Sequence, residues 1–310
     1  MPDIDLMILV AVVLAAFRRD CVVQHNSVLT GDLYFKEIMA AANVYRFSQV
    51  ARMDFETFSF LRQFLMDYGG LENSMYIYAG QKLMILIYIV RGRTNRETME
   101  RWQHSGATIS AIAHEVSSSL LSCRNRIYKP AKDGDPTPTQ ISNFAKFSPF
   151  FDNCIGAFDE TYVRAVIPFD EHVRARNRKK FVSQNVLGVV NFDMTFADAL
   201  CGWEGSAHDS RVYNDAKCRG LPLPNNKFYS GDAGYGLSKH VLTPFRGVRY
   251  HLLEFEMNRL GPAKAKELFN LRHSSLRNVV FGAVASLRRF PILVKMSPYD
   301  YPFQVELVEC

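Results

Sequence analysis

Apolar residues recur every three or four positions through much of the first part of the chain. Residues 49–71 follow this spacing, which predicts one amphipathic helix ending at the Gly69–Gly70 pair. Residues 82–90 form a second apolar segment, and Gly92 follows it. The N-terminal part of the chain is therefore predicted to be α-helical.

Two more helices are predicted directly after these, with tight turns between them. Thr94 and Glu97 have the spacing of a capping box, and Thr108 opens a helix that runs to about Ser122. This succession resembles a helix-turn-helix. Its recognition helix would be residues 109–121, which are rich in Ser and contain no Lys or Arg. Two interpretations therefore stay open, a helix that reads DNA and a structural helical cap.

The character of the sequence changes between residues 129 and 149. Turn-forming residues such as Pro130 and Gly134 concentrate there and stop any helix. We therefore predict a helical region over residues 1–128, a linker over residues 129–149 and a second domain over residues 150–310.

The second domain has the pattern of an α/β fold. Glu160 and Thr161 are expected to make a turn after the first strand. A helix that begins at Ser206 or His208 is expected before the last strand. An RNase H-like fold has this order of elements: three early strands, then a helix, and then a strand that returns beside the first. The predicted fold class is thus a mixed five-stranded sheet with helices, preceded by an α-helical N-terminal domain. The predicted strands are residues 154–158, 162–167, 181–192, 195–203 and 227–230.

Aspartates stand where such a sheet would bring its strands together. Asp159 ends the first apolar strand and Asp232 follows a later one, between Gly231 and Gly234. Carboxylate oxygens are the ligands that Mg²⁺ prefers, and two such ions can activate water and stabilise a leaving oxygen at phosphorus. An Asp at a strand end is also a common turn former. Asp209 is a third candidate, either as a site carboxylate or as the cap of the following helix.

Positive charge favours a polyanionic partner. The formal net charge is +6 and the pI is about 8.9, with a basic run at residues 174–180. The simplest such partner is DNA, although a solvated basic loop has the same composition. The candidate nucleic-acid-binding residues are Arg176, Arg178, Lys179 and Lys180 in that run, with Arg272 and Arg277 on a C-terminal helical stretch.

Cysteine spacing and apolar runs favour an intracellular protein. The six cysteines are scattered and have no zinc-binding spacing, so we expect reduced thiols. The apolar run at residues 6–17 is too short to cross a bilayer and is expected to be a buried or docking helix, with an uncleaved membrane anchor as the alternative. We therefore expect no membrane association and a location in the nucleus, the cytoplasm or both.

Several blocks of the second domain resemble one known family. In order and spacing they are similar to the PIF/Harbinger transposases and the nucleases derived from them. The blocks are GAFDETYV at 156–163, NRKKFVSQNV at 177–186, GWEGSAHDSRV at 202–212, GDAGY at 231–235 and ELFNLRHSSLRN at 267–278.

This resemblance implies a DDE-type DNA endonuclease that uses Mg²⁺ or Mn²⁺. Asp159 would be its first carboxylate, Asp232 the acid after the fourth strand, and Asp209 a carboxylate near the metals. Because a metal-bound water supplies the nucleophile, His208 and His273 are not expected to act as general bases. The resemblance also implies a separately encoded Myb-like partner that recognises the DNA sequence. It leaves the oligomeric state open.

One acid of the family pattern is missing. The final Glu should follow Val280, but Phe281 and Gly282 come next, as though two or three residues were deleted. Glu267 lies about two helical turns upstream and is expected to be a surface or capping acid. The chain also ends sooner than the family usually does. Two hypotheses follow, a nuclease with impaired activity and a catalytically silent protein that binds DNA or chromatin proteins.

Overall fold

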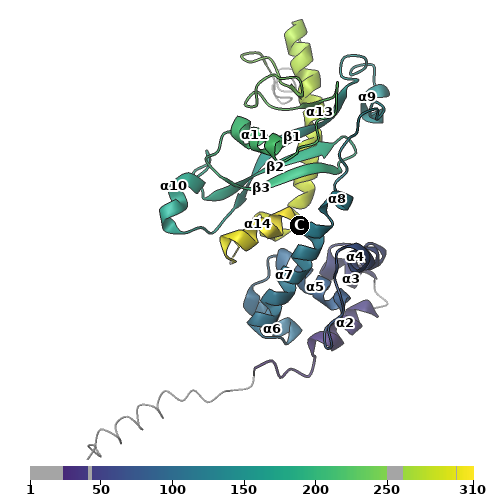
Figure 1. Cartoon of the computed structure of the whole chain (residues 1–310), viewed down its shortest axis with the longest axis vertical. Coiled ribbons are helices and arrows are strands. Elements are labelled where there is room, and N and C mark those ends of the chain that lie inside the picture. The colour runs from purple at the N-terminus through teal and green to yellow at the C-terminus, as the bar shows by residue number, and fades with distance from the viewer. Residues whose placement is uncertain (1–23, 41–43, 250–260, 298) are drawn as a thin grey trace, which may run out of the picture.

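A helical part and a sheet flanked by helices lie one after the other along the long axis of the molecule (Figure 1). The predicted helix at residues 6–17 lies outside the residues that the structure describes. Within the described ranges, no helix is long and apolar enough to cross a membrane. The computed structural model describes residues 24–40, 44–249, 261–297 and 299–310.

The helical part is assembled around α5. Ten of its twelve residues are buried, because every side of this strongly apolar helix meets a neighbour. The helices of this part are α2 (Gly31–Met39), α3 (Val44–Ala51), α4 (Phe55–Tyr68), α5 (Ala79–Val90), α6 (Asn95–Trp102), α7 (Gly106–Ser122) and α8 (Arg124–Ile127).

The single helix predicted over residues 49–71 is wrong, since α3 and α4 are separate. Arg52 has a φ of 60°, a left-handed conformation that ends α3. Asp54 then caps α4, because its carboxylate accepts a hydrogen bond from the Thr57 amide at 2.6 Å. The apolar spacing continues across the break, so periodicity alone could not reveal it.

The predicted capping box is confirmed, and the helix after it packs into the core. Thr94 and Glu97 cap each other's backbone amides at the start of α6. In α7, Ile109 and Val116 are fully buried, and the Ser117 hydroxyl donates to Glu306 near the C-terminus. This packing favours the structural interpretation of α7.

The second part is the predicted mixed five-stranded sheet. Its order is β3-β2-β1-β4-β5, with β1–β2 and β2–β3 antiparallel and β1–β4 and β4–β5 parallel. The elements are α9 (Thr139–Ser142), β1 (Cys154–Arg164), η1 (Phe169–Glu171), α10 (His172–Ala175), β2 (Ser183–Asn191), β3 (Phe196–Glu204), α11 (Asp209–Cys218), β4 (Phe228–Ser230), β5 (Val241–Leu242), α13 (Ala265–Leu287), η2 (Pro291–Leu293) and α14 (Tyr301–Glu309).

The turn predicted at Glu160 and Thr161 is also wrong. Strand β1 passes straight through both residues, which pair with Leu187 and Val186 of β2. Two polar residues in a row indicated a turn, but here the adjacent strand supplies the backbone hydrogen bonds. Asp159 therefore lies in the middle of β1 and not at its end.

Helices α13 and α11 pack on opposite faces of the sheet, and this sorts the side chains of β1. Ala157 and Val280 pack together beneath α13, while Phe158 stacks on Tyr213 of α11 with ring centroids 5.2 Å apart. Successive side chains of a strand point to opposite faces. Asp159 accordingly faces α13, and Glu160 faces the α11 side.

Segments far apart in the sequence join the two parts. The predicted linker packs through Ile141 and Phe147 against Leu276 of α13. At the other end of the chain, α14 lies between the sheet and the helical part (Figure 1), with Phe303 and Leu307 in the core around α5. Residues 301–309 thus complete a core that consists mostly of N-terminal helices.

Candidate carboxylate site

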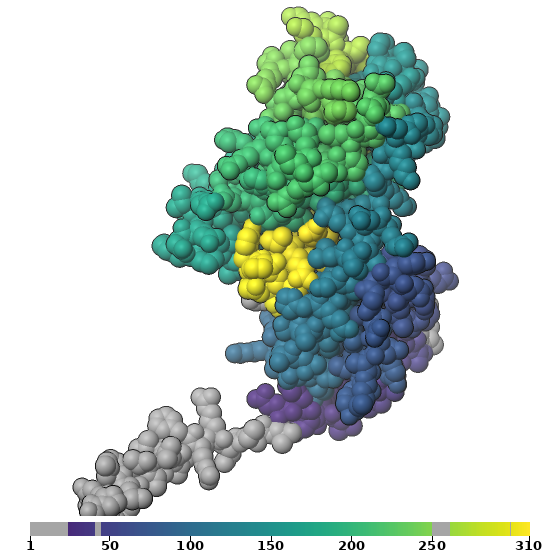
Figure 2. Space-filling model, in the orientation of Figure 1, coloured from purple at the N-terminus to yellow at the C-terminus, as the bar shows by residue number. Residues whose placement is uncertain are grey.

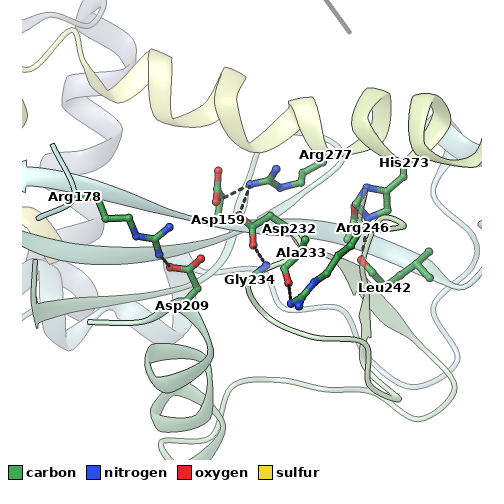
Figure 3. Close-up of polar contacts among 11 residues, drawn as sticks. Asp159, Arg178, Asp209, Asp232, Ala233, Gly234, Leu242, Arg246, His273 and Arg277 are labelled. Carbon is green, nitrogen blue, oxygen red and sulfur yellow. Dashed lines mark hydrogen bonds and ion pairs between the residues drawn. The ribbon is translucent and has the colours of Figure 1, made fainter. Parts of the chain in front are cut away.

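Two of the three predicted aspartates meet at one arginine of α13 (Figure 3). The Arg277 Nη2 lies 2.7 Å from Asp159 Oδ1 and 3.9 Å from Asp232 Oδ2. Asp159 comes from the middle of β1, and Asp232 follows β4, the parallel neighbour of β1. The sheet topology thus brings together two carboxylates that are distant in the sequence.

Helix α13 is held in place on both sides of Arg277. Val280 is fully buried against the sheet. His273 Nε2 lies 2.9 Å from the Leu242 carbonyl oxygen and 2.9 Å from Ser230 Oγ. Burial lowers the pKa of His273 to about 4, so the ring is neutral at physiological pH. Through these contacts His273 positions α13 against β4 and β5.

Asp209 reaches the same region from the start of α11. Its side chain does not take the cap position, because His208 is the N-cap residue. Instead Asp209 Oδ1 pairs with Arg178 Nη2 at 2.5 Å (Figure 3). The structure therefore favours the site interpretation of Asp209 over the capping one.

Gly234 lets two of the carboxylates approach its backbone closely. Its amide donates to Asp232 Oδ1 at 2.7 Å. A Cβ at this position would overlap Asp209 Oδ2 and lie 2.9 Å from Asp232 Oδ1. Glycine is thus required sterically, and the carboxylates of Asp209 and Asp232 lie next to each other at this point of the backbone.

Glu160 brings a fourth carboxyl group close to these. Its Oε2 accepts a hydrogen bond from Asn185, while Glu160 Oε1 and the Tyr235 hydroxyl are buried and find no hydrogen-bond partner among the described residues. Burial raises the pKa of Glu160, the Asn185 hydrogen bond opposes this, and the adjacent Asp209 raises it further. Sequence reasoning treated Glu160 only as a turn residue.

Burial is the main cause of the raised pKa values at the site. It raises the pKa of Asp159, although the Arg277 guanidinium acts in the opposite direction. Burial also raises the pKa of Tyr235 well above its ordinary value, and the four surrounding carboxylates add to the effect. The four acids therefore lie close enough to Tyr235 to act on it electrostatically.

The predicted basic residues divide into two groups. Arg178 reaches the site, whereas Arg176, Lys179 and Lys180 are exposed on the same segment. Arg272 lies over the Phe150 ring at 5.7 Å, because its position on α13 points it away from the carboxylates. Its role in nucleic-acid binding stays a prediction.

One basic residue near the site was missed. Arg246 donates a hydrogen bond to the Ala233 carbonyl, directly beside Asp232 (Figure 3). It follows β5, outside the sequence blocks that resemble the family, so only the fold shows its location. Asn270 of α13 fixes this segment through hydrogen bonds to the backbone of Phe245.

No acid of α13 takes the place of the missing Glu. Phe281 directly follows Val280, and the Arg277 guanidinium lies 5.2 Å from its ring centroid. Glu267 accepts from the Ala263 amide at 2.9 Å and pairs with Arg249 at 3.0 Å, which makes it a capping acid as expected. Among the described residues, no group of three Asp, Glu, His or Cys side chains is placed to bind a metal.

The donors present nevertheless suit a hard divalent cation, with two carboxylates in place of three. Asp209 and Asp232 supply anionic oxygens that both lie next to Gly234. Asp159 and Asp232 already share a positive charge, that of Arg277. The chemistry of these donors fits a cation near Asp232, although Arg277 and Arg178 now neutralise the outer carboxylates.

Comparison with known proteins points to the same class. Residues 168–309 match a family described as DDE superfamily endonuclease, and residues 26–122 match a domain of unknown function, DUF8040. The C-terminal part of this chain is therefore similar to the DDE superfamily endonucleases, consistent with its RNase H-like sheet.

A named relative agrees with this assignment. "Protein ALP1-like" of Arabidopsis thaliana is 31% identical over 166 residues, which cover 47% of this chain and 37% of that protein. The chain thus spans little more than a third of the length of this curated relative. No solved structure matches it. The family and relative together support the resemblance to Harbinger transposase-derived nucleases.

Proposed function

We propose that this chain is a DNA endonuclease of the DDE type that binds one divalent cation, Mg²⁺ or Mn²⁺, beside Asp232. The observation that supports this most is the meeting of carboxylates at Asp232, which shares Arg277 with Asp159 and lies beside Asp209 at Gly234. Asp232 and Asp209 would hold the cation, while Asp159 stays paired with Arg277. When bound, such a cation lowers the pKa of a bound water and neutralises charge at phosphorus.

The basic residues around the carboxylates would bind the DNA backbone. Arg178 and Arg246 border the site, and Lys179 and Lys180 are exposed next to Arg178. Contacts of Lys and Arg with phosphates fix the register of a duplex without reading its sequence. We therefore assign sequence recognition to a separate Myb-like partner, which requires a nuclear location.

A second function is favoured by Phe281. A half-exposed aromatic ring stands next to Arg277, where the family resemblance places a metal-binding Glu. With only Asp ligands, cleavage would be weak or absent while DNA binding persists. The alternative is thus a catalytically silent protein that binds DNA through the same basic surface.

One experiment separates the two functions. Mn²⁺ binding is measured by electron paramagnetic resonance and plasmid nicking by gel, for the unaltered chain, Asp232→Asn and Phe281→Glu. We expect Asp232→Asn to weaken Mn²⁺ binding at least about tenfold, and Phe281→Glu to strengthen binding and increase nicking. Asp67→Asn in α4, far from the site in the fold, serves as the control.

The outcomes are distinct. Nicking that Asp232→Asn abolishes supports the nuclease. DNA binding without nicking, in the unaltered chain and in Phe281→Glu alike, supports the silent protein. Mn²⁺ binding that is equal in Asp232→Asn and Asp67→Asn rejects the proposed metal site.

A further inference from the structure

The connection between β1 and β2 projects from the sheet as an arm, residues 165–182, with α10 at its outer end (Figure 1, Figure 2). Two contacts close its base. The Ala165 amide donates to the Val182 carbonyl at 3.3 Å, and Asn177 Nδ2 donates to Ser183 Oγ at 2.9 Å. The segment predicted as a flexible basic loop is therefore folded back on itself and joined to the sheet.

The arm also has a small apolar core. Ala165, Ile167 and Ala175 are buried together. Gln304 of α14 fastens this core, because it accepts from the Val166 amide at 3.0 Å and donates to the Val166 carbonyl at 2.9 Å. The apolar groups that stabilise the arm thus lie inside it.

Two large apolar side chains of the arm are outside this core. Phe169 is 86% exposed and Val173 is 83% exposed. They are four residues apart across η1 and α10, a spacing that places side chains on one side of a helical turn. A single exposed apolar residue is ordinary. Two neighbours at the end of a fastened arm form an apolar tip.

The net positive charge of the arm favours DNA as its partner. The arm contains five Arg and Lys residues at positions 174–180 and two acids, Asp170 and Glu171, which lie between the two tip residues. Three of these cations, Arg176, Lys179 and Lys180, have exposed side chains. Duplex DNA offers phosphates to the cations and stacked bases to the tip, and inserted apolar side chains unstack a base step and kink the duplex.

We propose that the Phe169–Val173 tip is a wedge that enters a base step of the bound duplex and kinks it beside the carboxylate site. This rests on the DNA binding proposed above. Arg178 joins the arm to the site, because it lies at the base of the arm and pairs with Asp209 at 2.5 Å. The base of the arm thus lies at the carboxylate site, and the tip lies at the outer end of the arm.

The test uses the full chain without divalent metal, so that cleavage does not interfere. Two duplexes of equal length carry a dye at each end, one intact and one with a two-nucleotide gap. Affinity is measured by anisotropy and bending by energy transfer. The unaltered chain should bend the intact duplex and bind the gapped one roughly tenfold more tightly, because a gap removes the cost of unstacking.

The decisive variant is Phe169→Ala with Val173→Ala, and the matched control is Met75→Ala with Tyr76→Ala, two exposed apolar residues of the helical part. We expect the tip variant to bind DNA but to lose both the bending and the preference for the gap. Bending equal to that of the control overturns the wedge. Unchanged bending with lost binding to anionic vesicles would overturn it in favour of a membrane contact. If the unaltered chain binds neither duplex, the proposed DNA binding itself fails.

Discussion

The two arginine–aspartate pairs of the site differ in their surroundings. Arg277 exposes 8% of its side chain and Asp159 16%, whereas Arg178 exposes 62% and its partner Asp209 10%. A buried guanidinium must be paired, because an isolated charge in the interior is very costly. Arg178 can leave Asp209 and be solvated by water. The Arg277–Asp159 pair is therefore part of the core. In the Arg178–Asp209 pair, a phosphate can take the place of Asp209 as the partner of Arg178.

This difference gives the site a fixed side and an exchangeable side. The α13 side, with Arg277 and His273, is buried against the sheet. The arm side, with Arg178, faces solvent. An incoming anion would therefore disturb the arm side first, and the fold should tolerate changes there better than on α13.

The largest effect is expected on the fixed side. Arg277→Ala should lower the free energy of unfolding by about 3–5 kcal/mol, since it leaves Asp159 buried without its partner. Arg178→Ala, the matched change, should lower it by less, since the Arg178 side chain is mostly exposed, although the buried Asp209 loses its partner there too. Urea unfolding measures both. Equal losses would show that the two pairs do not differ in this way. Mn²⁺ should restore part of the stability of Arg277→Ala if a cation can replace the guanidinium.

A pH effect of intermediate size is expected from His273. Its pKa is lowered to about 4 in the folded chain, below the usual 6.5. Protons therefore bind the unfolded chain preferentially. The contribution of His273 to the free energy of unfolding is fully present above about pH 6.5 and falls by up to about 3 kcal/mol toward pH 4. His273→Gln keeps a donor for the Leu242 carbonyl and should flatten this part of the profile. A slope identical in both proteins would contradict the buried neutral ring.

The smallest effect is expected on the exchangeable side and concerns DNA. Arg178→Ala should reduce the slope of log affinity against log salt by about 0.9, which is one phosphate contact. Arg272→Ala is the matched comparison, because Arg272 lies over Phe150 and away from the carboxylates. Equal slopes in the two variants would mean that Arg178 does not contact phosphate.

Much of the sheet was predictable because its signals are local. Alternating and apolar runs predicted most of β1, β2, β3 and β4, whereas the two-residue β5 was not predicted. The order of elements placed Asp159 near Asp232. The error at Glu160 and Thr161 has a physical cause, since β2 pairs with both residues and keeps the strand extended. A pairing between strands is not visible in a local pattern.

Other parts of the site depend on contacts between distant segments. Arg246 reaches Ala233 only because β5 lies beside β4, and no sequence block marks it. The sequence shows that Gly234 lies close to Asp232, but only the fold shows that it also lies against Asp209. The arm carried a recognisable charge signal, whereas its small core around Ile167 depends on α14 and was not foreseeable.

The position of α14 also bears on the order in which this chain can fold during synthesis. Phe303 and Leu307 complete the core of helices that begin more than two hundred residues earlier. Domains generally fold N-terminal first as they leave the ribosome. Here the N-terminal helices must wait for residues 301–309 before their core is closed. Until then these helices expose apolar surface, so we expect chaperones to bind the incompletely synthesised chain.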